Sequence, residues 1–220
     1  MANWQIRDWL AAARETPPLE SDASFFSSVP WTDEWLRNGN YKSTRFASRE
    51  AKTHTTEDEL FSKIIKTDRT VPHCLVLIRR DLLNPRNESS ASSTQSQGSS
   101  ATNPEVVVLF DLQAGLSGFP DTLHGGIACT LLDESLGICV ELSRHGLSAG
   151  QSQPLTELYT AQLNMSYRRP AKLPGVFMAR CWLEKKEGRK YWLKAELCDA
   201  NGDVCNGADG LWITARPQKI

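Results

Sequence analysis

Residues 125–142 read GGIACTLLDESLGICVEL, and this stretch decides the fold class. Apolar side chains occur on nearly every side of a helix drawn through it, and Asp133 and Glu134 are its only charges before Glu141. A helix that is hydrophobic on most faces is usually a buried helix. The stretch therefore predicts a central helix enclosed by other elements.

Segments typical of β-strands lie on both sides of this helix. They are rich in β-branched and aliphatic residues or alternate with period two, and they cover 71–80, 105–112, 155–168, 176–183, 191–197 and 204–214. Short turns at 186–189 and at Asn201-Gly202 indicate antiparallel neighbours. The sequence thus predicts an α+β domain in which an antiparallel sheet of about six strands wraps around a central buried helix.

The remaining segments suggest the domain limits. Residues 1–70 are expected to form an irregular or helical N-terminal extension, with a short helix after Asn3 and a second one at about 56–65. Residues 71–216 are expected to form the domain. Within it, 87–103 is a Ser-rich stretch without large apolar side chains, which predicts a disordered insert.

Composition excludes several classes of protein. The 220 residues carry a net charge of -1, which argues against a globally basic nucleic-acid binder. No apolar run approaches the roughly 18 residues that a membrane span needs, and the apolar core at 10–13 is too short for a signal peptide. The six cysteines show no C-x-x-C spacing and are expected to be reduced and buried. We expect a cytoplasmic protein, with a weak mitochondrial transit peptide as the alternative.

The start of the predicted helix carries the clearest chemical signal. Residues 119–126 read FPDTLHGG, so His124 precedes Gly125 and Gly126 at the first turn. Glycines allow a ligand to approach the backbone closely, and the first N–H groups of a helix have no internal acceptors. Fixed donors of this kind are what an oxyanion hole for acyl transfer requires.

Asp133 lies nine residues after His124, which is roughly 13 Å of helical rise. Asp133 and Gly125 are therefore too far apart to act on one carbonyl within a single subunit. Two antiparallel helices of a symmetric dimer would bring them together twice. Burying a carboxylate in an apolar helix costs free energy unless the carboxylate has a partner or a catalytic task. The alternative to a catalytic role for Asp133 is a structural one, in an ion pair or a cap. The alternative for His124 is that of an ordinary surface or core histidine whose hydrogen bonds are satisfied.

These residues resemble a known family. His124-Gly125-Gly126, Asp133, Gly137 and the pattern A-x-L-N-x-x-Y-x-R-P at 161–170 are similar to the hot-dog-fold acyl-CoA thioesterases with an H-G-G-x-x-x-x-x-x-D helix. Together with the E-G-R-K turn at 187–190, they look closest to the mammalian mitochondrial long-chain acyl-CoA thioesterases. The resemblance covers about 71–214.

The resemblance implies a role for each residue. Asp133 would act as general base on water or as nucleophile, and Gly125, with Gly126, would donate N–H groups to the thioester oxygen. His124 would position the carbonyl, and Thr160 would orient the water or the acid. The family further implies an active site at a dimer interface, in a homodimer or a dimer of dimers, and no metal or redox cofactor.

The chain also departs from the family pattern. Some relatives have an Asn six residues before the histidine, where this chain has Gly118. Some use Glu as the acid; Glu134 points about 100° away from Asp133 on the helix, so only one of the two can face the site, and we choose Asp133. An insertion at 144–154 precedes the strand that carries Thr160.

Positive charge is concentrated in one segment. Residues 165–194 hold nine Lys or Arg and two Glu, so the segment is +7 and the remainder is -8. This predicts a patch for the phosphates of coenzyme A or phosphopantetheine, although a solvated sheet face explains it equally well. Asn164, Tyr167, Arg168 and Arg169 are the candidate substrate-binding residues, with Lys185, Lys186, Arg189 and Lys190 as weaker candidates.

The favoured function is hydrolysis of an acyl-CoA or of an acyl group on a carrier protein, in lipid or secondary metabolism. The alternatives are a hot-dog dehydratase, whose motifs are not found, and a non-catalytic acyl-CoA-binding protein of the same fold. A nucleic-acid binder that uses Trp182 and Trp192 ranks last, because no RNP-like or Gly-x-x-Gly element is present.

Overall fold

The structure is a computed structural model that describes residues 13–83, 99–146 and 157–215. Three predictions fall wholly or mostly on other residues: the helix after Asn3, most of the Ser-rich insert, and the greater part of the insertion at 144–154. They lie outside the described residues.

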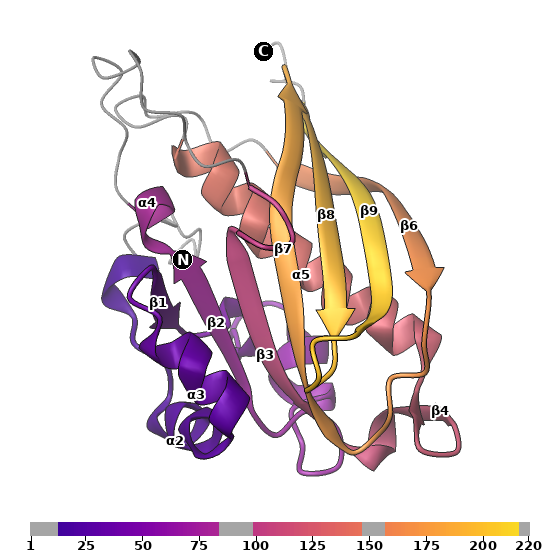
Figure 1. Cartoon of the computed structure of the whole chain (residues 1–220). Coiled ribbons are helices and arrows are strands. Elements are labelled where there is room, and N and C mark those ends of the chain that lie inside the picture. Colours follow the sequence, from indigo (N-terminus) through magenta and orange to yellow (C-terminus); the bar gives the residue numbers. More distant parts are fainter. Residues whose placement is uncertain (1–12, 84–98, 147–156, 216–220) are drawn as a thin grey trace.

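A seven-stranded antiparallel sheet forms the body of the described chain, with the strand order β1-β2-β3-β7-β8-β9-β6 (Figure 1). The strands are β1 (Tyr41–Thr44), β2 (Cys74–Arg79), β3 (Val106–Leu112), β6 (Leu158–Tyr167), β7 (Gly175–Glu187), β8 (Lys190–Cys198) and β9 (Val204–Thr214). A small separate hairpin consists of β4 (Ser117–Phe119) and β5 (Thr122–Leu123). The antiparallel α+β fold is confirmed.

The additional strand comes from the segment that we expected to be an extension. β1 pairs with β2 from Tyr41 opposite Arg79 to Thr44 opposite Val76, and so forms one edge of the sheet. The other strands of the sheet all come from residues after 71, in agreement with the expected six or so. The domain boundary at residue 71 stays a prediction, and the sheet itself extends across it.

The long helix α5 (Gly125–Gly146) follows the β4–β5 hairpin and precedes β6, as predicted. The other helical elements are α2 (Glu20–Ser28), α3 (Pro30–Arg37), α4 (Arg80–Leu83), and the short turns η1 (Ala47–Arg49), η2 (Leu60–Ile64) and η4 (Ala114–Leu116). The helix expected at about 56–65 is thus a single π-helical turn, η2. No helix among the described residues combines the length and the apolar character needed to cross a membrane.

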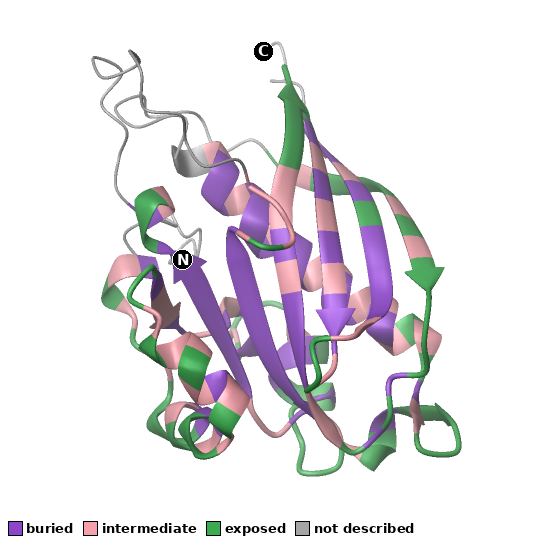
Figure 2. Cartoon of the chain, viewed as in Figure 1, coloured by how far each residue is buried: buried purple, intermediate pink, exposed green. Residues whose placement is uncertain are grey.

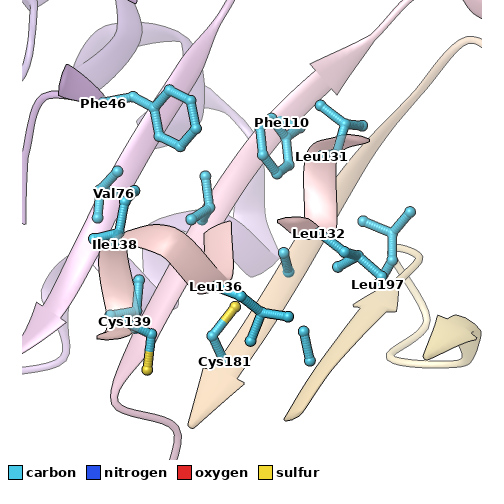
Figure 3. Packing of buried hydrophobic residues seen from close by; sticks show 14 of the residues in the cluster. Phe46, Val76, Phe110, Leu131, Leu132, Leu136, Ile138, Cys139, Cys181 and Leu197 are labelled. Carbon is cyan, nitrogen blue, oxygen red and sulfur yellow. The ribbon is translucent and has the colours of Figure 1, made fainter. Parts of the chain in front are cut away.

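Helix α5 packs along one face of the sheet (Figure 1). Leu131, Leu132 and Leu136 are fully buried, and they lie close to Phe110 and Leu197 in the sheet (Figure 3). Burying each leucine side chain contributes about 1.5–3 kcal/mol relative to leaving it in water. The packing of α5 is therefore a main source of stability, and it holds the helix in a defined position relative to the strands.

Strands β2 and β3 are buried along their whole length (Figure 2), because both faces of the sheet are covered there. Alternate side chains belong to two clusters: Val76, Ile78, Val108 and Phe110 pack with α5, and Leu75, Leu77, Val107 and Leu109 pack with Phe26 and the partly buried Trp31 and Trp35 of α2 and α3. At the other end of the sheet, β6 is largely exposed. The two ends of the sheet thus differ in burial: β2 and β3 are enclosed on both faces, and β6 is open to solvent.

Candidate active site

His124 begins helix α5 as its N-cap residue. Its carbonyl accepts the first helical bond, from the Ala128 N–H at 3.0 Å, and its ring Nδ1 accepts a hydrogen bond from the Gly126 N–H at 2.9 Å. A side chain at this position that accepts the N–H two residues later satisfies one of the unpaired donors of the helix end. Because Nδ1 is the acceptor, the proton of the neutral ring lies on Nε2.

The glycines around His124 leave space for its ring. A Cβ atom at Gly126 would lie 3.1 Å from both Nδ1 and Cε1 of the ring, and one at Gly118 would lie 2.8 Å from Cδ2 and 3.0 Å from the His124 Cα. Gly118, which departs from the family pattern, therefore forms the wall against which His124 packs. The role of Gly118 was missed by sequence reasoning, which treated the position only as a lost donor.

Gly125 is in contact with β6 through Tyr167. The Tyr167 hydroxyl donates a hydrogen bond to the Gly125 carbonyl at 3.2 Å, and a Cβ at Gly125 would lie 3.0 Å from the tyrosine ring. Within the described part of the chain, no acceptor is recorded for the Gly125 N–H. Gly126 uses its N–H to hold His124, so of the two expected oxyanion donors only Gly125 has its N–H available.

Asp133 faces the same strand farther along the helix. The Thr160 hydroxyl donates a hydrogen bond to its Oδ1 at 3.1 Å, so the structure brings these two predicted residues together. Burial raises the pKa of the Asp133 carboxyl above its ordinary value, and the hydrogen bond from Thr160, which stabilises the charged form, opposes part of this rise. A half-buried carboxylate of raised pKa is a stronger base than an exposed one.

The neighbouring acid, Glu134, lies on a different side of α5. Its carboxylate accepts a hydrogen bond from the Ser48 hydroxyl, in η1. Burial also raises the pKa of Glu134, and the Ser48 hydrogen bond opposes this. Glu134 therefore joins α5 to the segment before β2 and does not face β6.

An irregularity in β6 allows Thr160 and Tyr167 to reach the same helix. They are seven positions apart, and in a regular strand two side chains an odd number of positions apart lie on opposite faces. The pairing of β6 with β9 shifts register between Thr160 and Gln162. This bulge reverses the alternation, so that Leu163, Met165 and Tyr167 face the core and α5 after it, as Leu158 and Thr160 do before it.

The other candidate substrate-binding residues lie elsewhere around β6. Asn164 is on the opposite face, where its Oδ1 accepts a hydrogen bond from Gln162 at 3.2 Å. Arg168 and Arg169 directly follow Tyr167, near the start of α5. Both are more than half exposed, and they pair with Glu196 (3.6 Å) and Asp203, respectively.

The weaker basic candidates are not close to this helix start. They belong to the β7–β8 hairpin, at the end of the sheet opposite the β4–β5 hairpin (Figure 1). Lys185 pairs with Glu187 at 2.6 Å, and Lys186 lies over the Tyr191 ring at 5.1 Å. The basic residues of 165–194 are thus divided: Arg168 and Arg169 adjoin the candidate site, Lys172 donates to Thr122 in the hairpin before it at 3.4 Å, and the β7–β8 hairpin residues lie at the far end of the sheet.

The site therefore consists of two half-sites along β6. One contains His124, Gly125 and Tyr167, and the other contains Asp133 and Thr160. Gly125 and Asp133 are eight residues apart in α5, which is about 12 Å. In the described ranges no group of three or more His, Cys, Asp or Glu side chains is placed to hold a metal ion; that the reaction needs none stays a prediction.

The wall formed by Gly118 can be tested directly. In Gly118→Ala the new methyl group would meet His124, so we expect the ring to move, the Gly126 cap to be lost, and the free energy of unfolding to fall by about 1–2 kcal/mol. Urea unfolding measures the loss, and the ¹⁵N NMR signal of His124 Nδ1 reports the lost hydrogen bond. Gly39→Ala, where a Cβ meets no atom within 4 Å, is the matched control. An unchanged Nδ1 signal in Gly118→Ala would show that this packing is unimportant.

Part of the chain is similar to known proteins. Residues 121–206 match the family model described as "Thioesterase superfamily". Verlamelin biosynthesis protein B of Lecanicillium sp is 23% identical over 93% of each chain. Acyl-coenzyme A thioesterase THEM4 of Bos taurus is 32% identical over 52% of this chain, which spans 43% of the length of the bovine protein.

One solved structure is a hypothetical thioesterase with coenzyme A from Streptococcus pneumoniae. It is 16% identical, covers 52% of this chain and 83% of its own, and has a TM-score of 0.42. The relatives support the prediction that the chain is an enzyme of the thioester-hydrolase class. Residues 121–206 thus correspond to the thioesterase superfamily, and the described chain has the predicted hot-dog fold.

Proposed function

We propose that this protein hydrolyses an acyl thioester, with Asp133 as general base and the start of α5 as the site of the thioester carbonyl. The observation that carries the proposal is the Asp133–Thr160 pair, a half-buried carboxylate of raised pKa that faces β6. The named acyl-coenzyme A thioesterase among the relatives supports the reaction type.

The reaction needs a base and a donor to the oxyanion. Asp133 removes a proton from water as the water oxygen attacks the carbonyl carbon, and negative charge develops on the carbonyl oxygen. The Gly125 N–H and the His124 Nε2–H are the donors assigned to that oxygen. The C–S bond then breaks, and the leaving thiolate takes the proton back from Asp133. Direct attack by the Asp133 carboxylate, through an anhydride that water hydrolyses, is the alternative route.

Strand β6 is the surface through which we expect two subunits to pair. It has ten residues, pairs with β9 alone among the described strands, and forms an edge of the sheet. Tyr159 and Tyr167 on this strand are 55% and 59% exposed. A long exposed edge with apolar side chains is a template for pairing with another strand.

Antiparallel pairing of β6 with its copy would join the two half-sites. Thr160 marks the Asp133 half-site on this strand, and Tyr167 marks the Gly125 half-site. About a two-fold axis between Leu163 and Asn164, residue 160 of one subunit stands opposite residue 167 of the other. Asp133 of one protomer then lies beside the helix start of its partner, and this bridges the 12 Å that separates them within one chain.

The proposed substrate is an acyl-CoA or an acyl group on a carrier protein. Arg168 and Arg169 are exposed beside the Gly125 half-site, so phosphate groups of either donor can replace their present acidic partners. Asn164 and Tyr167 stay proposals as substrate contacts. We place the protein in the cytoplasm, in lipid or secondary metabolism; the biosynthetic name of one relative supports the latter.

Replacement of the acid is the primary test. We expect Asp133→Asn to lower the rate of thiol release from a panel of acyl-CoAs by about 10²-fold or more, because the amide cannot accept the proton. Glu134→Gln is the matched control and should keep most of the activity, since Glu134 faces Ser48. Binding of acyl-CoA without turnover by the unmodified protein would instead indicate a non-catalytic binding protein.

Mixing two inactive variants tests the shared site. Asp133→Asn and His124→Ala each damage one half-site. In a mixed dimer, one of the two sites combines the intact His124 of one subunit with the intact Asp133 of the other. Under statistical mixing half of the dimers are mixed, so about one quarter of all sites are intact. The mixture should therefore show about one quarter of the activity of the unmodified protein. Recovery that does not exceed the sum of the parents would argue for sites formed within single chains.

The hydrogen bond to Asp133 predicts the direction of a pH effect. Thr160→Val removes a donor that stabilises the charged carboxylate, so the pKa of Asp133 should rise further. Because the base acts when deprotonated, the acidic limb of the pH–rate profile should move to higher pH, whereas Thr160→Ser should leave it in place. A limb that moves to lower pH in Thr160→Val would contradict this role for the hydroxyl.

A further inference from the structure

A cavity lies away from the candidate active site. Its volume is about 320 Å³, and it lies between the start of α2, the segment 45–51 and the start of β2. Arg45, Phe46, Arg49, Lys66, Leu19 and Cys74 are among the residues that line it. A volume of this size is at the lower end of the range for small-molecule sites.

The cavity is on a different side of α5 from Asp133. Ser48, between Phe46 and Arg49 of the lining, contacts Glu134, whereas Asp133 contacts Thr160 of β6. Adjacent helical residues point about 100° apart. A ligand in this cavity would therefore be separate from the substrate of the proposed reaction.

The basic side chains that line the cavity outnumber the acidic ones. Two carboxylates line it, and both have partners: Asp22 lies 2.9 Å from His73 Nδ1, and Glu50 lies 2.9 Å from Arg45. Among the described residues, Arg49 and Lys66 form no ion pair with an acid. Lys66 instead donates to the Arg49 carbonyl at 3.0 Å.

Arg49 is the most informative residue of the lining. It is only 5% exposed, and its Nη2 donates to the Pro72 carbonyl at 3.0 Å. Its Nη1 is buried and has no hydrogen-bond partner in the described part of the chain. Leaving a buried charged donor unsatisfied costs free energy. Nη1 is shielded from solvent, so the guanidinium has to turn toward the cavity that Arg49 lines for an anion there to supply the missing acceptor.

The remaining wall is apolar. Phe46 and Cys74 are each 2% exposed, and Leu19 covers one side. Burial raises the pKa of the Cys74 thiol well above its ordinary value, so the thiol is neutral and does not compete with an anion for Arg49. A guanidinium beside an apolar wall suits a carboxylate that carries a short hydrocarbon chain.

We propose that this cavity binds a small carboxylic-acid anion, with the carboxylate at Arg49 and Lys66 and a short apolar chain against Phe46 and Leu19. The proposal does not depend on thioester hydrolysis. It assigns a ligand to a cavity whose wall includes a buried guanidinium with one nitrogen, Nη1, that lacks an acceptor among the described residues.

Calorimetric titration of the full chain with hexanoate tests the proposal, with 1-hexanol as the uncharged probe. Hexanoate should bind, and 1-hexanol should bind about tenfold more weakly or not at all. Arg49→Met should weaken hexanoate at least about tenfold. Arg37→Met, at an exposed arginine paired with Asp33, is the matched control and should bind as the unmodified protein does.

A second variant covers the case in which Arg49→Met fails to fold. Ala51 is exposed at the rim of the cavity, so Ala51→Trp should block entry without removing the guanidinium. Loss of hexanoate binding in Ala51→Trp would support the proposal. Absence of binding to the unmodified protein, or equal binding in Ala51→Trp, would overturn it. The proposal would also be overturned if Arg168→Met lost hexanoate binding while the cavity variants Arg49→Met and Ala51→Trp kept it, because the acid would then bind in the candidate active site.

Discussion

Thr160 and Tyr167 can both touch α5 only because β6 is irregular between them. A regular strand would point one of the two toward the opposite face of the sheet. The bulge therefore allows one edge strand to contact α5 twice, at Gly125 through Tyr167 and at Asp133 through Thr160. The edge of β6 is exposed for a different reason, its place at the end of the strand order, so one strand carries both contacts to α5 and the edge at which we propose that two subunits pair.

Helix α5 can present Asp133 to β6 because its other faces are held by apolar packing. Leu131, Leu132 and Leu136 are fully buried against the sheet, so α5 cannot rotate without exposing them. Asp133 is then forced into a half-buried position, where its charge is disfavoured and its pKa is raised. The same burial that stabilises the fold thus raises the pKa of the carboxylate that we propose as the base. A single hydroxyl, that of Thr160, offsets part of the cost.

Much of this arrangement could be predicted from sequence because it depends on local pattern. The apolar stretch that contains Asp133 predicted the central helix, and the His-Gly-Gly motif predicted its start. The contribution of β1 depends on pairing between distant segments, which local pattern does not encode. Two further signals were available: the aliphatic runs at 74–79 and 106–112 indicate strands covered on both faces, and the change of apolar parity between Leu158 and Leu163 marks the bulge.

Adjacent acids on α5 illustrate why a motif alone does not assign a role. Asp133 and Glu134 are both carboxylates, and burial raises the pKa of both. Their partners differ, because Thr160 lies on an exposed edge strand and Ser48 lies in η1, beside a separate cavity. The first acid is beside the edge at which we propose that two protomers pair. The distinction between a base and a structural acid is thus made by what lies across from each side chain, and the helix, by turning about 100° between them, directs the two acids to different sides of the molecule.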